Sequence, residues 1–403
     1  MVRITGVFVS LALLVAAGCG EDTGEALQGH GHHGGHLAET YAAVVLASYE
    51  DSLAAAEELD RAIGELVKSP SAANLEAART AWYAAREPYL QTEAYRFYDG
   101  PIDHEPKGDD DEEGPEGLLN AWPLDENYID YVADDAEAGI VNDPSVEISK
   151  EELAALNAQG GEENIATGYH AIEFLLWGQD RSETGPGARP HTDYVTGNGG
   201  TAETQDRRGE YLTAVSSLLV DNLQSLVDAW KPDEDNYRAE LEGLEEGQAL
   251  ERILTGMIIL SGFETGGERL QTALDTGEQE DEHSCFSDNT TRDMVQDVRG
   301  IQNVYLGRYE TVDGDTVSGE RSVRDAVADR DEALAEKVEA RIAESLELAE
   351  ALERPFDREI SLDNEEGRER VAALIASLRT QEEDLMDVFQ EFELTVDIPQ
   401  PGE

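Results

Sequence analysis

Apolar residues recur at three- and four-residue steps along most of this chain, and this spacing constrains its fold more than any other feature. The first such run begins at Tyr41 and continues until Ser69-Pro70 interrupts it. Strict alternation of apolar and polar residues, which would indicate strands, is scarce. The pattern therefore predicts an all-α protein with two helical-bundle domains and long irregular loops.

The remaining periodicity predicts further helices. One begins near Ser71, and Pro88 is expected to kink or divide it because proline lacks the N–H that a helix needs. Others are expected over residues 209–230, 249–274, 325–352 and 368–392. The helix over 249–274 is nearly all apolar at its centre, so we expect it to be buried.

Two segments between the predicted helices have the composition of loops. The segments 101–117 and 181–209 are rich in glycine, proline and polar residues, which is typical of exposed loops. The second loop is the best candidate for a domain boundary, although its length also fits a functional loop. We therefore predict an N-terminal helical domain over residues 41–200 and a C-terminal helical bundle over 201–400.

The charge balance argues against one class of partner. The chain has 29 lysine and arginine residues against 89 aspartate and glutamate residues, a formal net charge of −60. Such a surface repels nucleic acid and attracts cations, so binding to DNA or RNA is not expected. Most of these carboxylates are expected to form a solvated surface suited to a saline environment. Acidity alone therefore identifies no metal.

Residues 1–19 have the pattern of an export signal. Arg3 supplies a positive start and an apolar stretch follows, too short to span a bilayer as a mature helix. The ending AAGC resembles the lipobox of bacterial lipoproteins, whose cysteine is lipidated, and here that residue is Cys19. Ala16 stands where a larger aliphatic residue is usual, so secretion without a lipid is the alternative. We expect a location in the cell envelope, anchored to a membrane and facing the periplasm or the cell surface.

A His/Gly-rich linker is predicted over residues 20–40. It contains His30, His32, His33 and His36. Glycine makes such a tract flexible, so it is suited to tethering the body of the protein away from a membrane. The histidines also have the composition of a transition-metal-binding tract, and composition does not decide between these two roles.

One apolar segment carries two polar side chains at helical spacing. Within GYHAIEFLLWGQD, residues 168–180, His170 and Glu173 are three positions apart and share one face if the segment is helical. Burying both groups is costly unless each finds a partner, either another side chain or a metal ion. The pair offers an imidazole and a carboxylate, which suit iron, zinc or manganese.

Further candidates lie on other predicted helices and in one acidic loop. Arg86 and Glu93 are two turns apart on one face and are candidates for binding a cofactor. When the two halves of the sequence are aligned at an offset of 175 residues, Glu93 pairs with Glu268. This weak internal similarity suggests that the two glutamates occupy equivalent positions. The loop 275–290 adds Asp281 and His283 as candidate metal ligands. We therefore predict a metal sphere drawn from His170, Glu173, Glu93, Glu268, Asp281 and His283.

Several other chemistries have little support in the sequence. Cys285 lies beside a histidine, but the surrounding negative charge raises the pKa of a thiol and suppresses the thiolate. If Cys19 carries lipid, Cys285 also has no cysteine to pair with. The chain contains no phosphate-binding loop, no dinucleotide fingerprint and no HExxH zinc-protease helix.

At these residues the sequence resembles the imelysin family, in particular its iron-regulated protein A branch. Gly168, His170 and Glu173 match the GxHxxE signature of the family. The segments GPEGLLNAWPLDENYIDYV, GPGARPHTDY and GERLQTALDTGEQEDEHSCFSDNT are similar to other recurrent segments of the family. The resemblance implies an exported, all-helical, two-domain protein associated with iron uptake, with its site between the domains. Imelysins were named as peptidases, and the resemblance does not decide which activity applies here.

Three hypotheses follow for the function. The first is a metal-binding lipoprotein that captures iron, or an iron-containing ligand, and delivers it to an uptake partner in the inner or outer membrane. The second is a zinc-dependent metallopeptidase in which Glu173 is the catalytic residue. It needs a second histidine from His104, His191 or His283. The third is an interaction protein in which His170 and Glu173 are purely structural.

Overall fold

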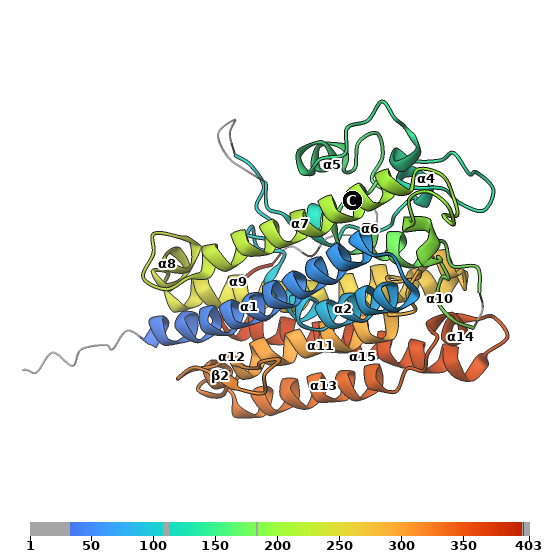
Figure 1. The fold of residues 1–403 in the computed structure, drawn as a ribbon. Coiled ribbons are helices and arrows are strands. Elements are labelled where there is room, and N and C mark those ends of the chain that lie inside the picture. Colours follow the sequence, from blue (N-terminus) through green and yellow to red (C-terminus); the bar gives the residue numbers. More distant parts are fainter. Residues whose placement is uncertain (1–32, 108–112, 183, 397, 399–403) are drawn as a thin grey trace, which may run out of the picture. The chain divides into compact units, whose positions relative to one another are not determined.

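Long helices form the body of the protein, and two short strands accompany them within the described residues (Figure 1). The structure is a computed structural model that describes residues 33–107, 113–182, 184–396 and 398. The predicted signal peptide and the first part of the His/Gly-rich linker lie outside these residues. The prediction of an all-α, helical-bundle architecture is confirmed.

The elements follow one another in a simple order along the chain. The α-helices up to residue 230 are α1 (His33–Lys68), α2 (Ala72–Leu90), α3 (Glu116–Leu119), α4 (Glu126–Ile129), α5 (Lys150–Leu156), α6 (Gly168–Trp177) and α7 (Gln205–Trp230). Those that follow are α8 (Tyr237–Glu242), α9 (Glu246–Ile258), α10 (Thr272–Thr276), α11 (Thr290–Leu306), α12 (Val323–Ala328), α13 (Glu332–Glu350), α14 (Phe356–Ile360) and α15 (Glu365–Glu391). Short 3-10 helices are η1 (Gln91–Tyr95), η2 (Ile140–Asn142), η3 (His191–Tyr194) and η5 (Gln279–Asp281), and η4 (Ile259–Gln271) is a π-helix. Strands β1 (Arg308–Glu310) and β2 (Thr316–Ser318) pair antiparallel.

The longest helices pack lengthwise against one another. Helix α1 packs on α2, α7 and α9, while α15 packs on η4 and α13. Figure 1 shows α1, α2 and α7 in one part of this arrangement and α11, α13 and α15 in another. Helix α11 contacts both α2 and α13, so it connects the two groups. The division of the body at residue 200 remains a prediction.

Three local features differ from the sequence-based expectation. Helix α1 begins at His33, so the last part of the predicted linker is helical. Pro88 does not divide its helix, which runs on to Leu90 before tightening into η1. The carbonyl that Pro88 leaves without a donor is that of Ala84, an exposed residue where water is available. The predicted helix over 249–274 widens into the π-helix η4 before it returns to α-geometry.

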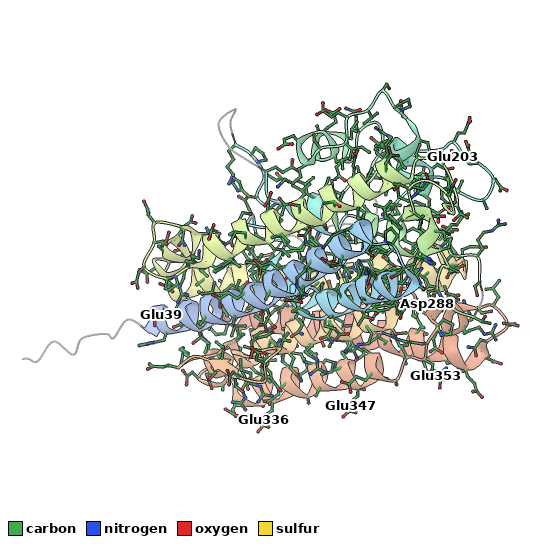
Figure 2. The ribbon with its side chains drawn as sticks, in the orientation of Figure 1. Glu39, Glu203, Asp288, Glu336, Glu347 and Glu353 are labelled. Atoms are coloured by element: carbon green, nitrogen blue, oxygen red, sulfur yellow. The ribbon has the colours of Figure 1, made fainter. Side chains whose placement is uncertain are left out.

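The acidic surface matches the charge balance. Glu39, Glu203, Glu336 and Glu347 are exposed, and Figure 2 shows them at the outside of the molecule. Asp288 is buried and therefore does not belong to this surface. None of the described helices is both long enough and apolar enough to cross a bilayer.

Candidate functional site

Helix α6 places the His-x-x-Glu motif inside the protein, because all of its residues are buried. The helix starts at Gly168, whose φ of +83° is a conformation that other residues rarely adopt. A Cβ atom there would lie 2.5 Å from the carbonyl oxygen of Leu119. Thr167 occupies the N-cap position, but its hydroxyl bonds to Asn157 instead of capping the helix. Only glycine therefore allows α6 to start this close to the neighbouring backbone.

His170 and Glu173 contact each other one helical turn apart. The distance between His170 Nδ1 and Glu173 Oε2 is 2.9 Å, and both side chains are fully buried. The other carboxylate oxygen, Oε1, accepts a hydrogen bond of 2.9 Å from the backbone N–H of Ser287. His170 Nε2 is buried and has no hydrogen-bond partner. The pair thus leaves one ring nitrogen uncommitted.

A second histidine reaches the same place from the segment before α11. The rings of His170 and His283 are 5.0 Å apart between centroids and nearly perpendicular. His283 Nδ1 lies 2.8 Å from Asp293 Oδ2, which also accepts a hydrogen bond of 2.5 Å from the Ser284 hydroxyl. Asn289 donates to the other oxygen of Asp293 at 2.9 Å. These bonds fix the orientation of the second imidazole.

Aromatic side chains enclose the two histidines. The ring of Trp122 lies 4.8 Å from that of His170 and 5.9 Å from that of Phe286. The hydroxyl of Tyr83 donates a hydrogen bond of 2.6 Å to the Ser287 carbonyl, which holds this segment against α2. The imidazole and carboxylate groups are therefore enclosed away from water.

Arg86 supplies the positive charge closest to Asp293. Its guanidinium donates to Asn120 Oδ1 at 2.5 Å and to Asp293 Oδ2 at 3.4 Å. The side chain is fully buried and lies 5.1 Å from the centre of the Tyr169 ring. Arg86 thus acts as the counter-ion of a buried carboxylate in this structure.

Glu93 is held by two arginines. Its Oε2 accepts hydrogen bonds of 2.8 Å from Arg96 and 2.5 Å from Arg269. Arg269 also donates to Asp297 at 2.9 Å, and Asn120 connects Glu93 to Arg86. Glu93 is therefore a member of a buried ion-pair network that extends from the histidines, and its oxygens are already occupied.

Burial favours the neutral forms of His170, Glu173 and His283. Burial raises the pKa of Glu173 to about 8, even though the Ser287 N–H and Arg86 act in the opposite direction. Burial, with Arg86 and His283 adding to it, lowers the pKa of His170 well below its usual value. Burial and Arg269 lower the pKa of His283 to about 4. At neutral pH both imidazoles are therefore uncharged and suited to bind a metal through nitrogen.

The arginine-paired carboxylates behave in the opposite way. Burial raises the pKa of Asp293, but Arg86 and the hydrogen bond from His283 outweigh it, and the net pKa is well below the usual range. Arg96 and Arg269 likewise overcome burial and lower the pKa of Glu93 to about 2. Two permanent negative charges therefore lie next to a neutral pair.

The sequence of the described region matches one known family. The family model described as imelysin matches residues 45–385, which is most of the chain. The chain belongs to the imelysin family. The resemblance to this family is confirmed, and the segment GYHAIEFLLWGQD that carries His170 and Glu173 lies within the matched residues.

Relatives of this imelysin carry names connected with iron. It is 28% identical over 274 residues to iron-regulated protein A of Synechococcus elongatus, covering 66% of this chain and 62% of that protein. The chain thus matches about three fifths of the length of this curated relative. The family and this relative suggest a function related to iron.

Two crystal structures share the fold. A protein of Parabacteroides distasonis described as an iron-regulated protein A precursor has a TM-score of 0.63 at 20% identity, covering 87% of this chain and 95% of that one. An imelysin-like protein of Psychrobacter arcticum has a TM-score of 0.58 at 13% identity, covering 90% and 98%. At these identities the likeness shows the fold of this imelysin.

The imelysin fold brings together most of the residues nominated from sequence. His170, Glu173 and His283 meet directly, and Asp293 and Asn120 join them to Arg86 and Glu93 through hydrogen bonds.

Two nominated residues lie outside this cluster. Glu268 is exposed, and Asp281 accepts a hydrogen bond from Thr276. The residue that faces Glu93 from η4 is Arg269. In the π-helix, Arg269 donates a hydrogen bond to Glu264 five residues earlier, a spacing that an α-helix does not bring together.

The structure also distinguishes the candidate second histidines. His283 contacts His170, whereas His104 pairs with Asp99 and His191 lies in η3. Cys285 is buried, and burial together with Glu173 raises the pKa of its thiol well above the usual value. This agrees with the expectation that it is not a nucleophile.

Sequence reasoning missed Asp293, Asp297 and Arg269. The two aspartates are four residues apart on α11, so both point from one helix face toward the network. That spacing between apolar neighbours was a usable signal, of the same kind as the His170 and Glu173 pair. The role of Arg269 depends on the π-helix, which sequence periodicity does not reveal.

The site fits a metal through one ligand atom. His170 Nε2 is buried without a partner and is a suitable nitrogen ligand for iron or zinc. Glu173 is hydrogen bonded to His170 and Ser287, and His283 is hydrogen bonded to Asp293. Both side chains must therefore rearrange to complete a coordination sphere. Among the described residues, the one group of three ligand-bearing side chains with atoms within 4.8 Å of one another lies elsewhere, at Asp180, Asp288 and Asp357.

Proposed function

We propose that this imelysin is an iron-binding protein of the cell envelope that takes part in iron uptake. The observation that carries the proposal is the buried, unpartnered Nε2 of His170, whose other ring nitrogen contacts Glu173. Proteins usually orient a metal-binding imidazole by letting its other N–H donate to a carboxylate, and Glu173 becomes that carboxylate when it loses its proton. The iron-related names in the family support iron as the metal, with zinc as the alternative.

The residues of the site would have different roles in binding the metal. His170 would bind through Nε2 and Glu173 through its carboxylate or by orienting the imidazole. His283 is the nearest further ligand, and Asp293 and Arg86 fix its position. Bound there, iron would supply redox or Lewis-acid chemistry. Because the site is fully enclosed, loading requires the segment of His283 and Ser287 to move away from α6.

The location of the protein rests on its sequence. The export signal over residues 1–19 and the lipobox-like Cys19 support lipid anchoring to a membrane of the cell envelope. An uptake protein in the inner or outer membrane would then receive the iron. Replacing Cys19 with Ser should move the protein from the membrane fraction to the soluble fraction of its host. Unchanged fractionation would contradict the lipid anchor.

Calorimetric titration with Fe²⁺, Zn²⁺ and Mn²⁺ tests the metal site. The chain should begin at residue 20 and carry Gln at His30, His32, His33 and His36, which silences the tract without shortening α1. We expect one site per chain, weakened at least tenfold by His170→Ala. His191→Ala is the matched control, because His191 lies outside the site. Equal affinity in the His170→Ala variant would remove the proposal.

A zinc peptidase is the second candidate, and the contact between His170 and His283 is the observation that favours it. The two histidines would hold zinc, and Glu173 would act as base after losing its proton. Cleavage of an unfolded peptide should then disappear with a chelator and in Glu173→Gln. Glu268→Gln, an exposed glutamate, is the control. Peptide cleavage that survives Glu173→Gln would exclude this reaction.

A further inference from the structure

Three carboxylates from distant parts of the chain meet beside the imelysin site. Asp180 follows α6, Asp288 lies just before α11, and Asp357 belongs to α14. One oxygen of each lies within 4.8 Å of the others. Figure 2 shows Asp288 toward the end of the molecule at which Figure 1 shows α10 and α14. Like charges this close repel one another unless protons or a cation separate them.

A fourth carboxylate points into the same group. Glu282 is fully buried, and its carboxylate interacts with those of Asp357 and Asp288 and with the hydroxyl of Thr290. Neither of its oxygens has a donor, and the same is true of both oxygens of Asp357 and of Asp288 Oδ1. An ionised carboxylate that is buried without a donor is strongly unfavourable. These oxygens are therefore placed for a ligand that the protein itself does not supply.

The neighbouring donors do not neutralise the group. Arg354 donates to Thr291 and Asn289, each at 3.1 Å, instead of to a carboxylate. Asp180 receives one hydrogen bond from the Ser182 N–H at 2.9 Å and another from the Gln279 amide. Arg354 lowers the pKa of Asp288 only in part, so the group of carboxylates keeps an excess of negative charge.

We propose that Asp180, Glu282, Asp288 and Asp357 bind one hard divalent cation, with calcium the best match. Calcium takes six to eight oxygen ligands at about 2.3–2.6 Å, so oxygens on opposite sides of one ion are separated by about 5 Å. The spacing of Asp180, Asp288 and Asp357 fits that limit, and Glu282 is the adjoining carboxylate that would complete the set. A set made only of oxygens disfavours copper and zinc, which prefer nitrogen or sulfur.

The cation would stabilise the position of the segment 282–288, which contributes His283 and Ser287 to the imelysin site. Glu282 precedes His283, and Asp288 follows Ser287, whose N–H holds Glu173. Binding between them joins the end of α6, this segment and α14. The inference does not depend on iron binding at His170, because the two sites use different side chains.

Shared protons are the competing explanation. Burial and the carboxylates of Asp357 and Asp180 raise the pKa of Asp288 to about 7, and burial raises that of Asp180 to about 6. Near pH 6 protons alone would relieve the repulsion. At pH 8 Asp180 and Asp288 are ionised, so a cation has its largest effect there.

Calcium titration of the chain from residue 20, stripped with EDTA at pH 8 and in 0.5 M NaCl, tests the proposal. High salt suppresses diffuse binding to the acidic surface. We expect one saturable site by calorimetry and a rise in melting temperature that follows its occupancy. Asp288→Asn and Asp357→Asn should each weaken binding at least tenfold, while Asp281→Asn, in the same segment but bonded to Thr276, should not.

The possible results separate the explanations. Absence of a saturable site in the wild type at pH 8 would overturn the proposal and favour shared protons. Equal binding by Asp288→Asn and Asp281→Asn would overturn it too. If Asp288→Asn does not fold, Asp357→Asn decides by the same criterion. Unchanged calcium binding in His170→Ala would support an assignment separate from the iron site.

Discussion

The segment from Glu282 to Asp293 has buried carboxylates on two sides, and their hydrogen-bond and charge partners differ. On the side of α2, Asp293 contacts Arg86 and is hydrogen bonded by His283. On the side of α14, Asp288 and its acidic neighbours have oxygens without donors. The carboxylate on the first side is satisfied by groups of the protein, and the carboxylates on the second side are not.

This difference shows that one segment can carry a buried carboxylate that the protein satisfies and others that would need a ligand. A buried ion is tolerated when an opposite charge and hydrogen bonds satisfy it, and it is destabilising when they are missing. The same substitution, Asp to Asn, should therefore have opposite effects on the two sides. Stability measurements on matched variants test this difference.

The largest effect is expected for Asp293→Asn. The change leaves the fully buried Arg86 without its anion, so we expect a loss of about 3–5 kcal/mol in the free energy of unfolding. Urea denaturation measures it. Glu87→Gln is the matched control, because its ion pair with Arg292 is more than one third exposed and should cost at most about 1 kcal/mol. Equal losses in the two variants would show that Arg86 does not need Asp293.

A pH-dependent effect is expected at Glu173. Its pKa is about 8 in the folded protein and near 4.5 when unfolded, so the native state holds an extra proton between these values. Stability from this group is present below pH 4.5 and is lost as pH rises through 8. Glu173→Gln imitates the protonated acid, so the wild type should lose about 2–4 kcal/mol relative to this variant between pH 5 and 9. Parallel stability curves across this range would contradict the neutral pair.

A backbone effect is expected at the start of α6, which holds the histidine side in place. Gly168→Ala combines a positive φ with a clash against the Leu119 carbonyl, so it should cost about 2–3 kcal/mol. Gly197→Ala has a similar φ of +86° but no atom within 4 Å of the new methyl group. Its cost should therefore be limited to strain of about 1–2 kcal/mol. Thermal melts of both variants separate the clash from the strain.

The local parts of this structure could be predicted from the sequence. Helical periodicity gave the all-α class, because it depends only on residues a few positions apart. The contact of His170 with Glu173 follows from their spacing for the same reason. The imelysin signature is also contiguous, so it needed no tertiary information.

The remaining parts depend on contacts that the sequence does not encode locally. Glu268 was chosen because a 175-residue offset pairs it with Glu93, but in the π-helix η4 it is Arg269 that contacts Glu93. The acidic group combines residues 180, 288 and 357, and no pattern marks these three among 89 acidic residues. Their proximity to one another distinguishes them, and it becomes visible only in the folded chain.

The smallest effect, and the one that separates the two sides most clearly, is expected for Asp288→Asn. In EDTA at pH 8 the wild-type carboxylate is ionised and unpaired, so the variant should be more stable by about 1 kcal/mol. At pH 5.5 the wild-type group is protonated and the difference should vanish. Saturating calcium should reverse the sign, because only the wild type gains binding energy. A variant that is less stable than the wild type in EDTA at pH 8 would mean that Asp288 is satisfied within the protein, as Asp293 is.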